Sequence, residues 1–124
     1  MVDKRIQRFF DKRSLSLSRF IHLCLYDKSL GFYQKNKINT HFTTAPEVSQ
    51  VFGECLGIFM LNISNSTGIS SFLELGPGNG TLMSDVIRTI SSLSKEEFEF
   101  YLYEKSRYLR YIQSHKLKSQ MSSK

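Results

Sequence analysis

The chain has 124 residues, of which 40% are hydrophobic and 13% aromatic, and its formal net charge is +6 at pH 7. This size and apolar content allow one hydrophobic core, which excludes a disordered tail and predicts a single globular unit or a piece of one. The basic residues are spread over both ends of the chain, so a nucleic-acid-binding module is only a weaker alternative. The longest apolar run, residues 56–61, is far shorter than the ~20 residues that a membrane-spanning helix needs.

The cysteines and the N-terminus bear on metal binding and on location. Cys24 and Cys55 each fall on the apolar face of a predicted helix, where a free cysteine behaves as a small hydrophobe, so neither a disulfide nor a metal site is predicted. Residues 1–13 are basic enough to pass for an organelle-targeting peptide, but they contain Asp3 and Asp11 and lead to no cleavage-site pattern. We therefore expect a cytoplasmic protein that begins with an ordinary helix.

Residues 1–68 have the pattern of a helical region. Asp3 can cap a helix that runs to about residue 12, and Ser16 can cap a second helix that stops near Gly31. Apolar residues in the second helix recur at helical spacing, which predicts a buried face made of Leu17, Phe20, Ile21, Cys24 and Leu25. Residues 32–43 keep no period and are rich in Lys and Asn, which indicates an exposed connection.

Residues 44–47, Thr-Ala-Pro-Glu, read as a capping box that starts a long helix. In this interpretation the Thr44 hydroxyl and the Glu47 carboxylate bond to free backbone amides, and Pro46 lies in the first turn. Gly53 and Gly57, four residues apart, leave room for another backbone to approach closely. The predicted apolar face of this helix consists of Val48, Val51, Phe52, Cys55, Phe59 and Ile63.

Residues 69–124 have the order strand, helix, strand, helix. We expect a strand over residues 69–75, a glycine loop over residues 76–80 and then a helix that turns Leu82, Val86, Ile90 and Leu93 inward. Alternating apolar residues predict a second strand that ends at Glu104, with Tyr101 and Tyr103 as packing residues. Such a βαβ unit has parallel strands and a helix over one sheet face. A last helix is predicted from Ser106, carrying Leu109, Ile112 and Leu117.

The glycine loop is the feature that points to a ligand. Ligands of open α/β sheets bind at the carboxyl ends of the strands, where this loop lies. Its spacing places Thr81 where the dinucleotide motif needs a glycine, and no Gly-Lys-Ser/Thr follows, so neither that motif nor the P-loop is present. A loop without side chains before a helix N-terminus instead suits a nucleoside that carries a carboxylate, although a simple tight turn is the alternative.

Two acidic residues stand beside this loop at strand ends. Glu104 occupies the place where a carboxylate accepts hydrogen bonds from both ribose hydroxyls, and the alternative is a solvated charge at a helix start. Glu74 is either a strand-end carboxylate with its hydrogen bonds satisfied or a group near a positively charged ligand atom. The loop and Glu104 in register favour a cofactor site.

Three segments make the chain resemble the MidA family of class I methyltransferases, which use S-adenosylmethionine (SAM). They are residues 20–26 with 31–33, residues 42–54 (FTTAPEVSQVFGE) and residues 73–83 (LELGPGNGTLM), within a likeness that spans about residues 6–117. The mitochondrial members of this family methylate an arginine on a respiratory complex I subunit during assembly. The resemblance implies SAM as cofactor and a protein arginine side chain as substrate. The predicted cofactor-binding residues are Glu74, Gly76, Gly78, Gly80, Glu104, Thr43 and Thr44.

The resemblance also implies that the chain is an N-terminal portion of a Rossmann-like sheet protein. We expect an α/β fold with a helical region over residues 1–68 and the truncated start of the SAM-binding domain over residues 69–124. A lone two-stranded parallel sheet is marginal and exposes apolar surface, so activity is expected only when a further segment or a second chain completes the sheet. The alternative is a noncatalytic SAM-binding remnant or interaction module from a split or decayed gene. No catalytic residue is predicted; Glu54 is a candidate for orienting a guanidinium, and the alternative is a surface charge.

Overall fold

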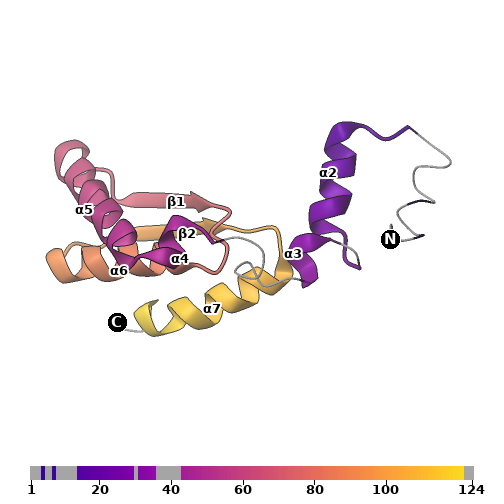
Figure 1. The fold of residues 1–124 in the computed structure, drawn as a ribbon. Helices are drawn as coiled ribbons and strands as arrows, with labels where there is room; N and C mark the ends of the chain where they lie inside the picture. The colour runs from indigo at the N-terminus through magenta and orange to yellow at the C-terminus, as the bar shows by residue number, and fades with distance from the viewer. Residues whose placement is uncertain (1–3, 5–6, 8–13, 30, 36–42, 122–124) are drawn as a thin grey trace.

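The computed structural model describes residues 4, 7, 14–29, 31–35 and 43–121. Its elements follow the order of N-terminal helices and then strand, helix, strand, helix (Figure 1). They are α2 (Leu17–Tyr26), α3 (Phe32–Lys35), α4 (Ala45–Val48), α5 (Gln50–Thr67), β1 (Ser71–Leu75), α6 (Thr81–Leu93), β2 (Glu99–Tyr103) and α7 (Arg107–Met121). This order confirms the predicted α/β class. The helix expected to start at Asp3 falls almost wholly outside the described residues.

The two strands pair in parallel, as the βαβ pattern predicts. Their register runs from Ser71 opposite Glu99 to Leu75 opposite Tyr103. Helix α6 covers one face of this sheet, with α7 alongside it (Figure 1). The core between them consists of Met83, Val86, Ile87, Ile90 and Leu117, against which Phe72, Phe98, Phe100 and Leu102 of the β1 and β2 region pack. Leu93, predicted to point inward, is instead 58% exposed because it lies in the last turn of α6, beyond this core.

The opposite face of the sheet is bare within the described part of the chain. Leu73, Leu75, Tyr101 and Tyr103 alternate onto this face, and each is more than half exposed. The prediction that Tyr101 and Tyr103 are packing residues is therefore wrong, since no described element lies over them. This face is therefore the exposed apolar surface that we expected of a two-stranded parallel sheet.

Helices α5 and α6 pack closely because α5 presents its two glycines to α6. A Cβ on Gly53 would stand 2.5 Å from Asp85 Cβ, and one on Gly57 would stand 3.0 Å from Thr89 Cβ. This confirms the predicted close approach but overturns the predicted apolar face of the long helix. With the glycines inward, Leu56 and Met60 join the core, whereas five residues of the predicted face are exposed: Val48, Val51, Phe52, Cys55 and Phe59.

The N-terminal helix α2 has the predicted cap but not the predicted burial. Ser16 Oγ accepts a hydrogen bond from the Arg19 amide at 3.4 Å. The helix ends at Tyr26 rather than near Gly31, because Asp27 Oδ1 takes the Ser29 amide in a turn. No residue of α2 is buried, and α3 is the main described element that contacts it, so the predicted buried face is wrong. Residues Phe32–Lys35 form a short helix where an irregular connection was expected.

The described residues also bear on the cysteine and membrane predictions. Cys24 and Cys55 are both free and exposed, so neither acts as a small buried hydrophobe. Within the described residues, no helix has the length and apolar character that crossing a membrane requires.

Candidate functional site

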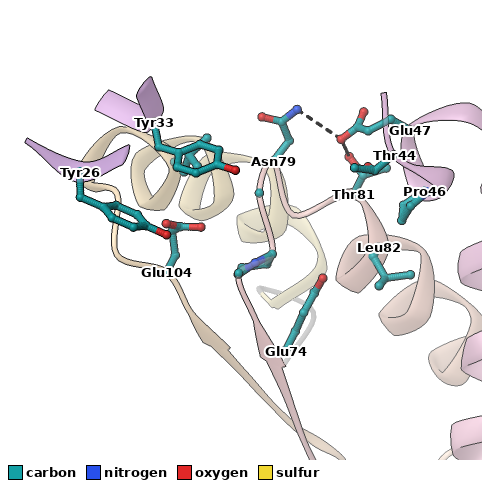
Figure 2. A pocket seen from close by; sticks show the side chains of 14 residues that line it. Tyr26, Tyr33, Thr44, Pro46, Glu47, Glu74, Asn79, Thr81, Leu82 and Glu104 are labelled. Atoms are coloured by element: carbon teal, nitrogen blue, oxygen red, sulfur yellow. Dashed lines mark hydrogen bonds between the residues drawn. The ribbon is translucent and has the colours of Figure 1, made fainter. Parts of the chain in front are cut away.

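A pocket of about 340 Å³ opens at the carboxyl ends of β1 and β2 (Figure 2). It draws its walls from the N-terminal helices, from α4, from the glycine loop and from the residues that follow β2. The lining residues are Tyr26, Tyr33, Thr44, Pro46, Glu47, Glu74, Gly76, Pro77, Gly78, Asn79, Thr81, Leu82, Glu104 and Leu109. Five of the seven predicted site residues are thus brought together: Glu74, Gly76, Gly78, Glu104 and Thr44.

The other two predicted residues do not line this pocket. Thr43 is exposed and precedes the lining segment. Gly80 is buried behind the loop, where it caps the N-terminus of α6, and a Cβ there would stand 3.2 Å from Gln113 Cγ. Gly80 therefore contributes to the loop backbone on the side away from the pocket, where it allows α7 to approach the loop closely.

The glycine loop has a backbone that other residues rarely adopt. Gly76, Gly78 and Gly80 have φ values of 71°, 55° and 76°, in the left-handed region that favours glycine. The Gly76 amide donates to the Tyr103 carbonyl at 2.9 Å, and Gln113 Nε2 donates to the Gly78 carbonyl at 2.7 Å. These bonds tie the loop to β2 and α7, so its pocket-facing backbone is held in place.

Glu47 is a site residue that the capping interpretation misplaced. Its Oε1 accepts hydrogen bonds from Thr81 Oγ1 at 2.6 Å and from Asn79 Nδ2 at 3.2 Å (Figure 2). Thr44 makes no side-chain cap hydrogen bond, so the capping box is absent. The helix ends at Val48, and Ser49 caps the long helix α5. Glu47 therefore joins α4 to the glycine loop, a contact between distant segments that no local pattern indicates.

Glu74 points into the pocket with one oxygen unsatisfied. Its Oε2 is buried and has no hydrogen-bond partner among the described residues. Burial raises the pKa of this carboxyl above its ordinary value of 4.5, because desolvation disfavours the charged form. The described residues thus leave Oε2 without a partner, and a ligand with a positive charge or a hydrogen-bond donor would stabilise this group.

We predict that Glu74→Gln makes the ligand-free chain more stable at neutral pH. The raised pKa means that the native state binds the Glu74 proton more tightly than the unfolded state does. Ionisation of Glu74 therefore lowers the free energy of unfolding as the pH rises from 4.5 through the raised pKa. Thermal unfolding at pH 4 and pH 7 measures this. The variant's advantage should be present at pH 7 and disappear at pH 4; an equal advantage at both values would contradict the assigned cause.

Glu104 lies at the other side of the pocket, directly after β2. Its Oε1 accepts the Ser106 amide at 2.7 Å, which orients the carboxylate and uses one of its acceptor positions. Tyr26 and Tyr33 lie beside it (Figure 2). The carboxylate keeps further acceptor capacity for a ligand with paired hydroxyls.

Glu54, the candidate for orienting a guanidinium, does not line this pocket. Its Oε1 accepts from Gln50 Nε2 at 2.6 Å and from Arg88 Nη2 at 3.4 Å on the outer surface of α5 and α6. Three carboxylates line the pocket, and no Lys or Arg of the described chain is among its lining residues. Within the described residues there is no cluster of His, Cys, Asp or Glu that could hold a metal. The side chains that line the pocket therefore carry net negative charge.

The known proteins that this chain resembles are SAM-dependent methyltransferases. Residues 55–124 match the family of S-adenosyl-L-methionine-dependent methyltransferases. The mitochondrial protein arginine methyltransferase NDUFAF7 of Danio rerio is 40% identical over 85 residues, which are 64% of this chain and 20% of the zebrafish protein. NDUFAF7 of Homo sapiens is 38% identical over 110 residues, covering 81% of this chain and 25% of the human protein. The chain therefore spans about a quarter of the length of such relatives.

Two solved structures from Burkholderia thailandensis show the same fold. One, bound to S-adenosyl-homocysteine, superposes with a TM-score of 0.74 at 26% identity and covers 94% of this chain and 32% of that protein. A native structure gives a TM-score of 0.71 at 24% identity. The match over residues 55–124 and these relatives establish that the chain belongs to the SAM-dependent methyltransferase family, as an N-terminal portion of its MidA-like members.

Proposed function

We propose that the pocket binds SAM and that this chain forms the cofactor-binding part of a protein arginine methyltransferase. The observation that carries the proposal is the meeting, in one pocket, of the glycine loop with Glu74 and Glu104. Each of these features has an ordinary structural explanation by itself. Their convergence on one space at the carboxyl ends of parallel strands is typical of a nucleoside cofactor site.

The three features match the three parts of the cofactor. The loop lacks side chains at Gly76 and Gly78, so the carboxylate of the ligand can approach the loop backbone beside the N-terminus of α6. Glu104 can accept hydrogen bonds from the ribose hydroxyls. Glu74, with its desolvated and unpartnered oxygen, suits the positively charged half of SAM, where the sulfonium and the amino group lie.

Bound SAM supplies a methyl group already activated by its sulfonium, so the protein's task is alignment. Glu104 and the loop hold the nucleoside, and the link from Glu47 to Thr81 and Asn79 keeps α4 against the loop. The arginine substrate rests on the names of the curated relatives. Because Glu54 faces away from the pocket, we propose that the carboxylate orienting the guanidinium comes from a segment that completes the sheet.

Titration calorimetry with SAM tests the cofactor assignment. We expect Glu104→Ala to weaken SAM binding about 100-fold, the loss expected for two hydrogen bonds to a charged carboxylate. Glu99→Ala is the matched control, because Glu99 is an exposed acid at the opposite end of the same strand. This variant should bind SAM with unchanged affinity. A folded chain that does not bind SAM, or an unchanged Glu104→Ala affinity, would overturn the assignment.

A noncatalytic SAM-binding module is the second candidate, and the bare sheet face favours it. Leu73, Leu75, Tyr101 and Tyr103 leave apolar surface uncovered, and each strand has one edge without a described partner. Transfer of radiolabelled methyl from SAM to arginine-containing protein would establish the methyltransferase and exclude the module. Cofactor binding without transfer is expected of both the module and a cofactor-binding part that needs a further segment for activity. The cytoplasmic location and the division at residue 68 stay predictions, and the curated relatives are named mitochondrial.

A further inference from the structure

The outer wall of the pocket is built by the N-terminal helices. Tyr26 is the last residue of α2 and Tyr33 belongs to α3, yet both line the pocket together with Glu104. Figure 2 shows the phenol of Tyr26 directed toward the Glu104 carboxylate, with the Tyr33 ring beside it. Two aromatic side chains from the region expected to be separate from the SAM-binding domain thus flank the residue proposed to hold the ribose.

Contacts at the turn after Glu104 hold these tyrosines in place. Ser106 is fully buried, and its Oγ donates to the Tyr33 carbonyl at 2.6 Å. Lys105 Nζ lies 4.8 Å from the centre of the Tyr26 ring and 3.0 Å from His22 Nδ1. Because Lys105 and Ser106 directly follow Glu104, the same short segment sets the positions of the carboxylate and of both rings.

The two rings have the chemistry to meet a purine nucleoside. Their centroids are 5.7 Å apart with the planes tilted by 35°, and both side chains are half-buried, so part of each ring remains open to the pocket. A tyrosine ring offers an apolar face for a base and a hydroxyl for a polar atom. Burial first, and then the nearby Glu104 and Tyr33, raise the pKa of Tyr26 above its ordinary value.

We propose that Tyr26 and Tyr33 are cofactor-binding residues that contact the nucleoside half of SAM, which makes the N-terminal helices part of the cofactor site. The inference rests on the proposed function, because it assumes that Glu104 holds the ribose. It goes further by naming side chains outside the glycine loop and the strand ends. The competing explanation is that the rings only pack against each other to attach α2 and α3 to α7.

Fluorine NMR of the 124-residue chain labelled with 3-fluorotyrosine tests this directly. The chain has 6 tyrosines and no tryptophan, so each tyrosine can give its own signal, assigned by single Tyr→Phe substitutions. We expect S-adenosyl-homocysteine and 5′-methylthioadenosine to shift the Tyr26 and Tyr33 signals saturably. Free homocysteine should not shift them. Tyr101, which lies on the bare sheet face and bonds to Glu99, is the internal control and should not move.

The outcomes separate the inference from the function on which it rests. If calorimetry shows S-adenosyl-homocysteine binding while the Tyr26 and Tyr33 signals stay still, the inference is wrong and the cofactor assignment stands. If only ligands carrying the homocysteine part move these signals, the nucleoside assignment is wrong. A folded chain that binds none of the three ligands overturns both. Tyr33→Ala should in addition weaken 5′-methylthioadenosine binding roughly tenfold, the size of one lost base–aromatic contact.

Discussion

Replacing Gly76 by Val is expected to weaken SAM binding by at least about 100-fold, because the new side chain would enter the space that the cofactor needs. Gly76 lines the pocket, and a Cβ there would meet no protein atom within 4 Å. Its φ of 71° adds backbone strain of about 1–2 kcal/mol for any residue with a Cβ. The backbone strain lowers the stability of the fold, whereas the valine side chain blocks SAM binding.

Gly68→Val is the matched control for this substitution. Gly68 has a φ of 75°, and a Cβ there would likewise meet no atom within 4 Å, but this glycine ends α5 and precedes β1, whereas the loop follows β1. Both variants should lose similar stability in thermal unfolding, while calorimetry should show lost SAM affinity for Gly76→Val alone. Equal affinities in the two variants would mean that Gly76 does not face the cofactor.

Replacing Gly53 by Leu is expected to destabilise the chain by about 1–2 kcal/mol, since over-packing by up to ~3 kcal/mol exceeds the ~1 kcal/mol that leucine gains over glycine in helix propensity. A Cβ at this position would stand 2.5 Å from Asp85 Cβ, closer than two such atoms can lie. Asp85 cannot easily move aside, because its side chain is buried and pairs with Arg88 at 3.0 Å. The α5 and α6 backbones would have to separate.

Asn62→Leu is the control on the same helix. Asn62 is exposed, so leucine there adds helix propensity without a clash, and stability should change by no more than about 0.5 kcal/mol. Urea unfolding followed by circular dichroism measures both variants. If Gly53→Leu were as stable as Asn62→Leu, the two helices would not be in the close contact described.

The βαβ unit and its loop were predictable because local patterns specify them. Alternation of Phe98, Phe100 and Leu102 predicts both a strand and the face that it buries, and these residues do pack on the core under α6. The loop glycines required no tertiary information either, since their place between a strand and a helix predicted a loop without side chains; the structure adds that all three have positive φ.

The errors occur where several local explanations suited the same residues. Thr44 and Glu47 fit a capping box, but Glu47 has stronger partners in Thr81 and Asn79, brought close only by folding. In α5 the aromatic side of the helix looked like the buried side. The glycines instead decided the packing, because two backbones approach closest where side chains are absent.

The sequence alone predicted the family by resemblance, the order of the elements, the parallel strand pair and the placement of Gly76, Gly78 and Glu104 around one site, whereas it left the role of Glu74 open. These features depend on short-range periodicity and on motifs that can each be recognised within a single segment of the chain. Only the tertiary structure decided that Glu47 holds the loop and that Tyr26 and Tyr33 flank Glu104. Contacts between segments far apart in the chain depend on how helices pack, and packing is set by shape complementarity that no single segment encodes.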